Sequence, residues 1–142
     1  METKLKLENQ LCFPLYAASK KIISKYTPIL SEFNLTYTQY IVLLVMFEKQ
    51  TCNIKDIGEA LFLDSGTLSP LIKKLERKGF LTKKRDLSDE RNVLITLTKK
   101  GKELEDKLSV VPNKIASCFN LNSKEANDLY TILYKLLKEE KK

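Results

Sequence analysis

The sequence predicts a mainly helical domain with one small β-hairpin. Three observations lead to this fold class: apolar residues recur at helical spacing through most of the 142-residue chain, only four Gly and four Pro interrupt it, and two short runs within residues 80–97 have strand-like spacing. With 43% apolar and 30% charged residues, the chain has the balance of a single domain, residues 1–142, with a core of its own.

The first helix is expected within residues 8–34. Pro14 is tolerated best in a first helical turn, so the helix should begin near Leu11 or Cys12. Pro28 should bend or interrupt the helix near its end. The helix carries an apolar stripe, which consists of Leu11, Leu15, Ile22, Ile23 and Leu30.

A capping-box pattern marks the start of the next helix. Thr36 is followed three residues later by Gln39, which predicts a helix over about residues 37–48. This segment is expected to be the central core helix, because six consecutive residues are too apolar to face water, namely Tyr40, Ile41, Val42, Leu43, Leu44 and Val45.

A helix-turn-helix is expected after it. Asn53 can cap a short helix over residues 54–61, and a second helix follows over about residues 65–78. The apolar residues of this second helix fall at i, i+3, i+4 and i+7, namely Leu68, Leu71, Ile72 and Leu75. Short polar residues followed by cations on the opposite face suit a helix that enters a DNA groove tip-first, and the candidate contacts are Ser65, Gly66, Thr67, Ser69, Lys73, Lys74 and Arg77. A solvated surface helix would carry a similar pattern.

Gly79 should end that helix, and two strand-like runs follow at residues 80–85 and 92–97. They predict a β-hairpin with a charged tip. A helix-turn-helix followed by a hairpin is a winged helix-turn-helix, here over residues 37–97 with its wing at about 80–97.

The tip of this wing can reach a minor groove, where arginine is favoured. Asp89 can orient Arg91 through a charge-assisted hydrogen bond. Lys83 and Arg85 lie on the first strand and are further candidate DNA contacts. The alternative is an exposed loop of balanced charge.

Apolar stripes outside the winged helix predict a homodimer. One long helix is expected from residue 98 to about 119, bent by Pro112, and a capped last helix should follow Asn122. The segments 8–34 and 98–142 together carry more apolar surface than a small winged helix can cover. A two-fold dimer would bury it and place two recognition helices about one DNA turn apart, matching a pseudopalindromic operator.

Charge points to the same partner. All seven units of net positive charge fall within residues 70–102, which hold eleven Lys/Arg against four Asp/Glu, and the remainder is neutral. Positive charge concentrated in one segment indicates that one face of the protein meets a polyanion, so double-stranded DNA is the expected partner.

Composition argues against several other classes of protein. The absence of histidine removes the commonest metal ligand and the commonest general base, so we expect no enzyme, no metal and no cofactor. Cys12, Cys52 and Cys118 form no CxxC pair, so neither a disulfide framework nor a zinc finger fits, and Cys52 has no assigned role. No segment is typical of a membrane span or a signal peptide, which predicts a cytoplasmic protein.

The tract DERNVLITLTKKG at residues 89–101 resembles the wing and wing-exit signature of the MarR family of winged-helix regulators. The tract LFLDSGTLSPLIKKLERKGFL at residues 61–81 resembles its recognition helix. Between Gln10 and Leu44, the tracts QLCFPLYAASKKI, YTPIL and LTYTQYIVLL resemble the organic-hydroperoxide-sensing OhrR-like branch, with its SarZ- and AbfR-type members. The resemblance covers nearly the whole chain.

In that branch, a cysteine near the start of the first helix is the sensor, and two tyrosines hydrogen-bond to its sulfur. The resemblance assigns these roles to Cys12, Tyr26 and Tyr37, with Tyr16 as a further aromatic neighbour, and implies that Cys118 is the resolving thiol of the partner subunit. Cys12 and Tyr26 are 14 residues apart, or about 21 Å along a straight helix, so they could meet only across a dimer interface.

A peroxide is attacked by a thiolate, which a helix N-terminus, tyrosine hydroxyls and Lys20 or Lys21 of a partner would favour at Cys12. Together with these features, the resemblance implies a repressor that is released from DNA when an organic hydroperoxide oxidises Cys12, through an intersubunit disulfide with Cys118. A regulator released by a small phenolic ligand in the dimer crevice and a thiol peroxidase using Cys12 stay open as alternatives. A protein that binds an acidic partner through its basic face is a further alternative.

Overall fold

The computed structural model describes residues 5–89 and 91–138. In chain order its elements are η1 (Leu7–Asn9), α1 (Cys12–Ser31), α2 (Tyr37–Lys49), β1 (Thr51–Asn53), α3 (Ile54–Leu61), α4 (Ser65–Arg77), β2 (Leu81–Arg85), β3 (Val93–Leu97), α5 (Lys99–Leu108), α6 (Val111–Ala116) and α7 (Ser123–Leu137).

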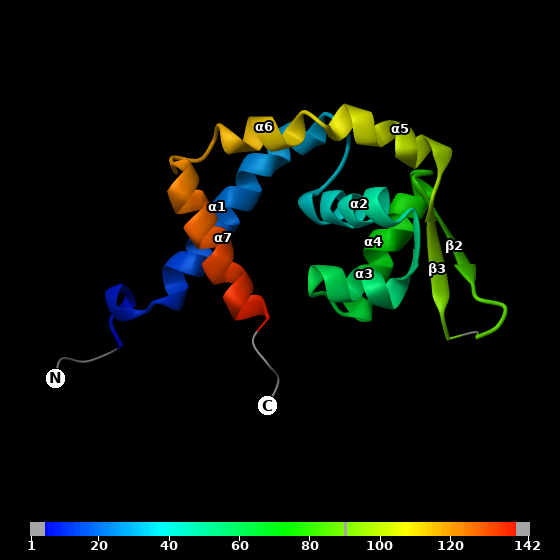
Figure 1. Ribbon diagram of the computed structural model, residues 1–142, viewed down its shortest axis with the longest axis horizontal. Helices are drawn as coiled ribbons and strands as arrows, with labels where there is room; N and C mark the ends of the chain where they lie inside the picture. Colours follow the sequence, from blue (N-terminus) through cyan, green and yellow to red (C-terminus); the bar gives the residue numbers. More distant parts are fainter. Residues whose placement is uncertain (1–4, 90, 139–142) are drawn as a thin grey trace.

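Figure 1 shows that these elements form two lobes. The helical lobe consists of α1, α6 and α7, and the winged lobe consists of α2, α3, α4 and a small sheet, with α5 running between the two. Glu90 of the expected wing and residues 139–142 of the expected dimerisation segment lie outside the described residues.

The helix starts of the winged lobe follow the predicted caps. Thr36 Oγ1 accepts a hydrogen bond from the Gln39 backbone N–H at 3.3 Å, and Gln39 Oε1 accepts one from the Thr36 N–H at 3.1 Å, so the capping box of α2 is confirmed. Asn53 Oδ1 accepts a hydrogen bond from the Asp56 N–H at 2.8 Å and caps α3 as predicted.

The core of the winged lobe lies around α2, the predicted central helix. Its fully buried side chains include Val42, Leu43, Met46, Ile57, Leu68, Ile72, Leu75, Leu81 and Ile95. The expectation that none of these six residues faces water was wrong for Leu44, which is 43% exposed. Leu44 follows Tyr37 and Ile41 on one helical stripe, and none of these three side chains is fully buried.

Within the described residues, the strands form one three-stranded antiparallel sheet in the order β1-β3-β2. β2 and β3 are the predicted wing hairpin, with Arg85 opposite Val93 near its tip. β1 was not predicted. It is three residues long and pairs with β3, where Cys52 lies opposite Ile95. A run this short shows no alternation of its own.

The segment after the wing is two helices rather than one bent helix. α5 ends at Leu108 and α6 begins at Val111, so the continuous helix expected over residues 98–119 is wrong. Pro112 lies in the first turn of α6, where its missing N–H has no intrahelical partner. The proline therefore starts a helix instead of bending one.

The first helix begins where the sequence places it. α1 starts at Cys12, so Pro14 lies in its first turn and removes no intrahelical hydrogen bond. α1 then continues through Pro28 to Ser31, which shows that Pro28 does not interrupt the helix.

The helical lobe leaves much apolar surface uncovered. In the described chain, α7 has no buried residue. The exposed large apolar side chains of α1 and α7, with the residue before α1, are Leu11, Phe13, Leu15, Tyr16, Ile23, Leu129, Tyr130, Ile132, Tyr134, Leu136 and Leu137. A patch of this extent is typical of an interaction surface. No described helix is both long and apolar enough to cross a membrane.

Candidate functional site

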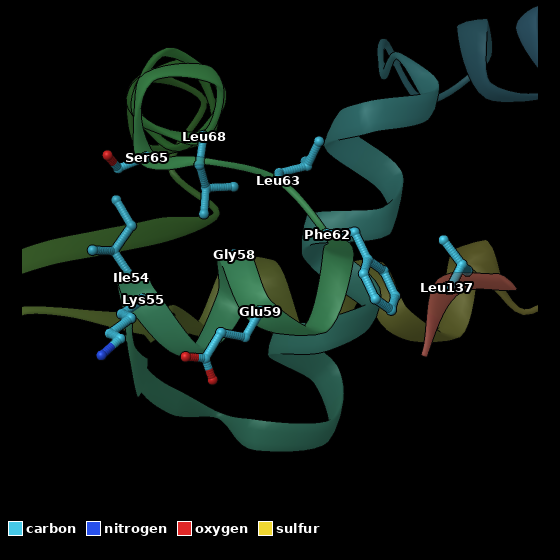
Figure 2. A pocket seen from close by; sticks show the side chains of 9 residues that line it. All are labelled: Ile54, Lys55, Gly58, Glu59, Phe62, Leu63, Ser65, Leu68 and Leu137. Atoms are coloured by element: carbon cyan, nitrogen blue, oxygen red, sulfur yellow. The ribbon is translucent and has the colours of Figure 1, made fainter. Parts of the chain in front are cut away.

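The turn between α3 and α4 sets where the candidate recognition helix begins. A Cβ on Gly58 would lie 2.7 Å from the Leu63 carbonyl oxygen, so the turn can pack on α3 only because this residue has no side chain. Phe62 occupies the left-handed region at φ +58° and is 52% exposed. Figure 2 shows its ring facing Leu137 of α7 across a groove of about 590 Å³.

α4 presents the predicted polar face to solvent. Its buried face is also as predicted and consists of Leu68, Ile72 and Leu75, with Leu71 half-buried. Asp64 Oδ1 accepts a hydrogen bond from the Thr67 N–H at 2.7 Å, and this bond lowers the pKa of Asp64 below its usual value. The candidate DNA contacts of this helix are all exposed, namely Ser65, Gly66, Thr67, Ser69, Lys73, Lys74 and Arg77.

The wing carries its cations outward. Lys83 and Arg85 are exposed on β2. At the tip, Asp89 Oδ1 accepts a hydrogen bond from the Arg91 N–H at 3.0 Å and lies 3.4 Å from Arg91 Nε, which confirms the expected pairing of these two side chains. The Arg91 side chain is 92% exposed, so the pair directs the guanidinium without burying it.

Cys12 is the first residue of α1, and its thiol is exposed. It lines an open groove of about 490 Å³ between α1 and α7. Lys20 Nζ donates a hydrogen bond to the Tyr16 hydroxyl at 3.3 Å in the same groove and lies 5.1 Å from the centre of that ring. The remaining lining residues are mostly apolar and comprise Leu15, Ser19, Leu133, Leu136 and Leu137. The groove thus places a sulfur at the positive end of a helix dipole beside an apolar wall.

Tyr26 and Tyr37 contact each other, with ring centroids 4.7 Å apart, and Tyr40 lies 5.9 Å from Tyr26. Burial and the neighbouring tyrosines raise the pKa of Tyr26 to about 12. Burial also raises the pKa values of Tyr37 and Tyr40, so all three hydroxyls are hydrogen-bond donors at neutral pH. Tyr40 was missed as a member of this cluster, although its position one turn after Tyr37 puts both on the same side of α2.

Within one chain the candidate sensor residues fall into two groups. Cys12 and Tyr16 share the groove near the start of α1. Tyr26 is 14 residues further along the same unbroken helix, about 21 Å away, and contacts Tyr37 instead. A single chain therefore does not place Tyr26 against Cys12.

The other two cysteines differ in environment. Cys118 follows α6 and is exposed, with Sγ donating to the Lys114 carbonyl oxygen at 3.5 Å, and it does not line the groove of Cys12. Cys52 in β1 is half-buried, with its sulfur 3.7 Å from that of Met46, and burial raises the pKa of its thiol. Among the described residues, no cluster of three or more His, Cys, Asp or Glu side chains could hold a metal ion.

Comparison with known proteins gives the family. Residues 24–108 match the model described as "Transcriptional regulator SarA/Rot". The chain belongs to the SarA/Rot family of transcriptional regulators. This membership confirms the resemblance to MarR-type winged-helix proteins, and it identifies a DNA-binding regulator rather than an enzyme, so the thiol-peroxidase alternative was wrong.

This SarA/Rot-family regulator is 52% identical over 123 residues to the HTH-type transcriptional regulator SarZ of Staphylococcus saprophyticus, over 87% of this chain and 84% of the relative. It is 44% identical over 140 residues to the organic hydroperoxide resistance transcriptional regulator of Bacillus subtilis, over 96% and 95% of the two chains.

The fold is similar to that of AbfR from Staphylococcus epidermidis. Reduced AbfR bound to DNA matches with a TM-score of 0.79 at 35% identity, over 95% of this chain and 94% of that chain. Disulfide-formed AbfR matches with a TM-score of 0.67 at the same 35% identity, over 95% of both chains. The described conformation is therefore more similar to the DNA-bound reduced state of that protein than to its disulfide state.

Proposed function

We propose that this regulator is a homodimeric, redox-sensing repressor whose sensor is Cys12. It binds a pseudopalindromic operator when reduced and leaves it when an organic hydroperoxide oxidises Cys12. The observation that carries the proposal is the exposed Cys12 thiol in the first turn of α1, in a groove whose other wall is the uncovered α7. A chemical change at this sulfur would act on the surface through which two copies meet.

Two copies would present two DNA-reading surfaces in the cytoplasm. In each copy, α4 enters the major groove, with the exposed hydroxyls of Ser65, Thr67 and Ser69 towards the bases and its cations towards phosphates. Arg91 at the wing tip reaches the adjacent minor groove. The similarity to a DNA-bound form of AbfR supports this assignment.

The sensing step consumes one hydroperoxide. The Cys12 thiolate attacks the outer oxygen of ROOH, the O–O bond breaks, and after proton transfer the products are Cys12 sulfenic acid and the alcohol ROH. Sulfur loses two electrons and the peroxide gains them. The apolar wall of the groove, which includes Leu15 and Leu136, suits an organic R group better than it suits hydrogen peroxide.

The partner subunit would complete the sensor. Because Tyr26 lies about 21 Å from Cys12 along α1, its hydroxyl can approach that sulfur only from the second copy. Its raised pKa keeps the hydroxyl protonated, as does that of Tyr37, so both can donate a hydrogen bond to the thiolate.

A second thiol then converts the sulfenic acid into a disulfide with the release of water, and Cys118 of the other subunit is our candidate. Cys118 is exposed and lies outside the Cys12 groove of its own chain. In AbfR, both the reduced and the overoxidised forms are seen bound to DNA, and a separate disulfide form exists. These relatives favour the disulfide, rather than higher oxidation of the sulfur, as the state that releases DNA.

The disulfide has a direct test. After treatment with cumene hydroperoxide, a non-reducing gel should show a covalent dimer that is absent in Cys118→Ser and retained in the matched control Cys52→Ala. If the gel shows only monomer and the peroxide still releases the protein from DNA, the mechanism uses one cysteine instead.

The whole proposal is tested by a mobility-shift assay on the promoter upstream of the chain's own gene. Reduced protein should retard this duplex, and cumene hydroperoxide should abolish the shift until a thiol reductant restores it. A shift that ignores the peroxide but responds to a phenolic ligand would refute Cys12 sensing and support ligand-controlled release.

A further inference from the structure

The end of α1 is fixed to the turn that follows it. The Leu35 N–H donates to the Leu30 carbonyl at 3.2 Å, the Asn34 N–H donates to the Ser31 carbonyl at 3.0 Å, and Asn34 adopts φ +57°. This is the helix-ending arrangement in which a left-handed residue satisfies the last carbonyls, and its apolar partners Leu30 and Leu35 are both buried. The Asn34 carbonyl therefore moves with the end of α1.

Lys78, the C-cap residue directly after α4, reaches across to this turn. Its ammonium donates to the Asn34 carbonyl oxygen and to Gln39 Oε1, the latter at 3.2 Å. Gln39 is the buried polar residue of the described core, at 3% exposure, and its Oε1 also accepts the Thr36 N–H. One lysine thus joins α4 to the end of α1 and to the first turn of α2.

The same residue is also attached to α5. The Lys78 carbonyl accepts a hydrogen bond from Lys100 Nζ at 2.8 Å, and Thr98 Oγ1 donates to the next carbonyl, that of Gly79, at 2.6 Å. The backbone at Gly79 adopts φ +87°, which glycine tolerates because it has no Cβ. The C-terminal end of α4 is therefore connected to α1, α2 and α5, whereas Ser65, Gly66 and Thr67 at its N-terminal end are exposed.

Lys78 differs from the lysines within α4. Lys73 and Lys74 are exposed, as expected for phosphate contacts. The Lys78 side chain is half-buried, and burial lowers its pKa from the usual value. Its ammonium is already engaged by two acceptors of the protein, which argues against a simple contact with DNA.

We infer that Lys78 is a positioning residue that fixes the recognition helix relative to α1 and thereby sets the half-site spacing that the dimer accepts. This inference rests on the proposed dimeric DNA binding. If two α1 helices form the interface, the angle between α1 and α4 determines the separation of the two α4 tips. One inserted base pair moves the second half-site by about 3.4 Å and roughly 34° around the duplex, so a rigid junction should reject it.

The test compares two duplexes. An operator is first selected from random duplexes by the reduced wild-type protein, and one base pair is then inserted at its centre. For wild type, the insertion should weaken binding by about tenfold or more, as measured by fluorescence anisotropy. For Lys78→Met, which keeps the aliphatic stem and removes the ammonium, the penalty should fall to about threefold or less.

Three further variants separate positioning from charge and stability. Lys99→Met removes an exposed lysine at the start of α5 and should keep the wild-type penalty. Lys78→Arg can still donate to two acceptors and should restore the wild-type penalty. Lys78→Gln is too short to reach both acceptors and should behave like Lys78→Met. The glutamine variant keeps the test valid if Lys78→Met folds poorly.

A Lys78→Met or Lys78→Gln protein that binds both duplexes more weakly by one common factor would overturn the inference, because it would show a stabilising role only. A wild-type protein that selects no duplex would instead refute the proposed DNA binding, and this inference with it. Wild type that binds the selected operator but tolerates the insertion would leave DNA binding intact and overturn the positioning role alone.

Discussion

Arg91 allows the wing to be tested separately from the fold. Its side chain is 92% exposed and is directed by Asp89, which accepts from the Arg91 N–H at 3.0 Å. The hairpin itself is closed by another bond, from the Asp86 N–H to the Asn92 carbonyl at 2.9 Å. Replacing Arg91 by alanine therefore removes no buried contact, and the melting temperature should stay unchanged.

Binding should respond strongly to the same change. An arginine in a minor groove that reads width and sequence contributes about 1 to 3 kcal/mol, so Arg91→Ala should raise the operator Kd by roughly 5- to 150-fold at fixed salt. Asp89→Ala keeps the cation but loses its orientation, and the loss of affinity should be smaller.

The measurement is fluorescence anisotropy with an operator duplex and a scrambled duplex of equal length. Arg91→Ala should weaken binding to the operator more than binding to the scrambled duplex. Equal affinity of wild type and Arg91→Ala for the operator would remove the wing from the DNA interface, and equal losses on both duplexes would reduce Arg91 to a phosphate contact.

Three other predictions follow from exposure and burial. Lys73→Ala and Lys74→Ala should each lower the slope of log K against log salt by about 0.9 without changing sequence preference, and an unchanged slope would exclude a phosphate contact. Cys52 should react with a maleimide at pH 8 more slowly than Cys12 does, because burial raises the pKa of the Cys52 thiol and leaves less thiolate. Peptide mass spectrometry after timed quenching measures both rates, and equal rates would contradict the prediction. Leu136→Glu, at a side chain that is 54% exposed in the single chain, should leave the fold intact and yield a monomer in light scattering, whereas a persistent dimer would place the interface elsewhere.

Local signals in the sequence were sufficient for most of the fold. The Thr36 and Gln39 pair, the Asn53 cap and the spacing of Leu68, Ile72 and Leu75 each act within a few residues, and the structure contains all of them. The pairing of Asp89 with Arg91 is of the same kind, because the two residues are neighbours in the wing.

Features that depend on distant partners were not visible. β1 exists because Cys52 pairs with Ile95, 43 residues later, and no local pattern marks it. The bridge from Lys78 joins residues that are 39 and 44 positions apart.

Pro112 does not bend a helix as the sequence suggests, because proline both disrupts and starts helices, and only the end of α5 decides between the two.

The exposure of the candidate DNA contacts was predictable from the sequence, but the way the candidate sensor residues come together was not. The candidate DNA contacts are exposed as expected on α4 and the wing. Cys12 shares its groove with Tyr16, whereas Tyr26 and Tyr37 lie together at the other end of α1. The two groups can meet only between two copies of the chain. Residue spacing within one chain excludes a contact inside that chain, but it does not determine how the copies are arranged.

The central claim is that the Cys12 thiol controls release of the operator. The most direct measurement adds one equivalent of cumene hydroperoxide to the reduced protein–operator complex and follows anisotropy together with the mass of the Cys12 peptide, for wild type and Cys12→Ser. We predict that wild type loses the operator in proportion to loss of the Cys12 thiol, while Cys12→Ser binds with similar affinity and stays bound. Release from Cys12→Ser at the same peroxide concentration, or release from wild type with its Cys12 thiol intact, would contradict the claim.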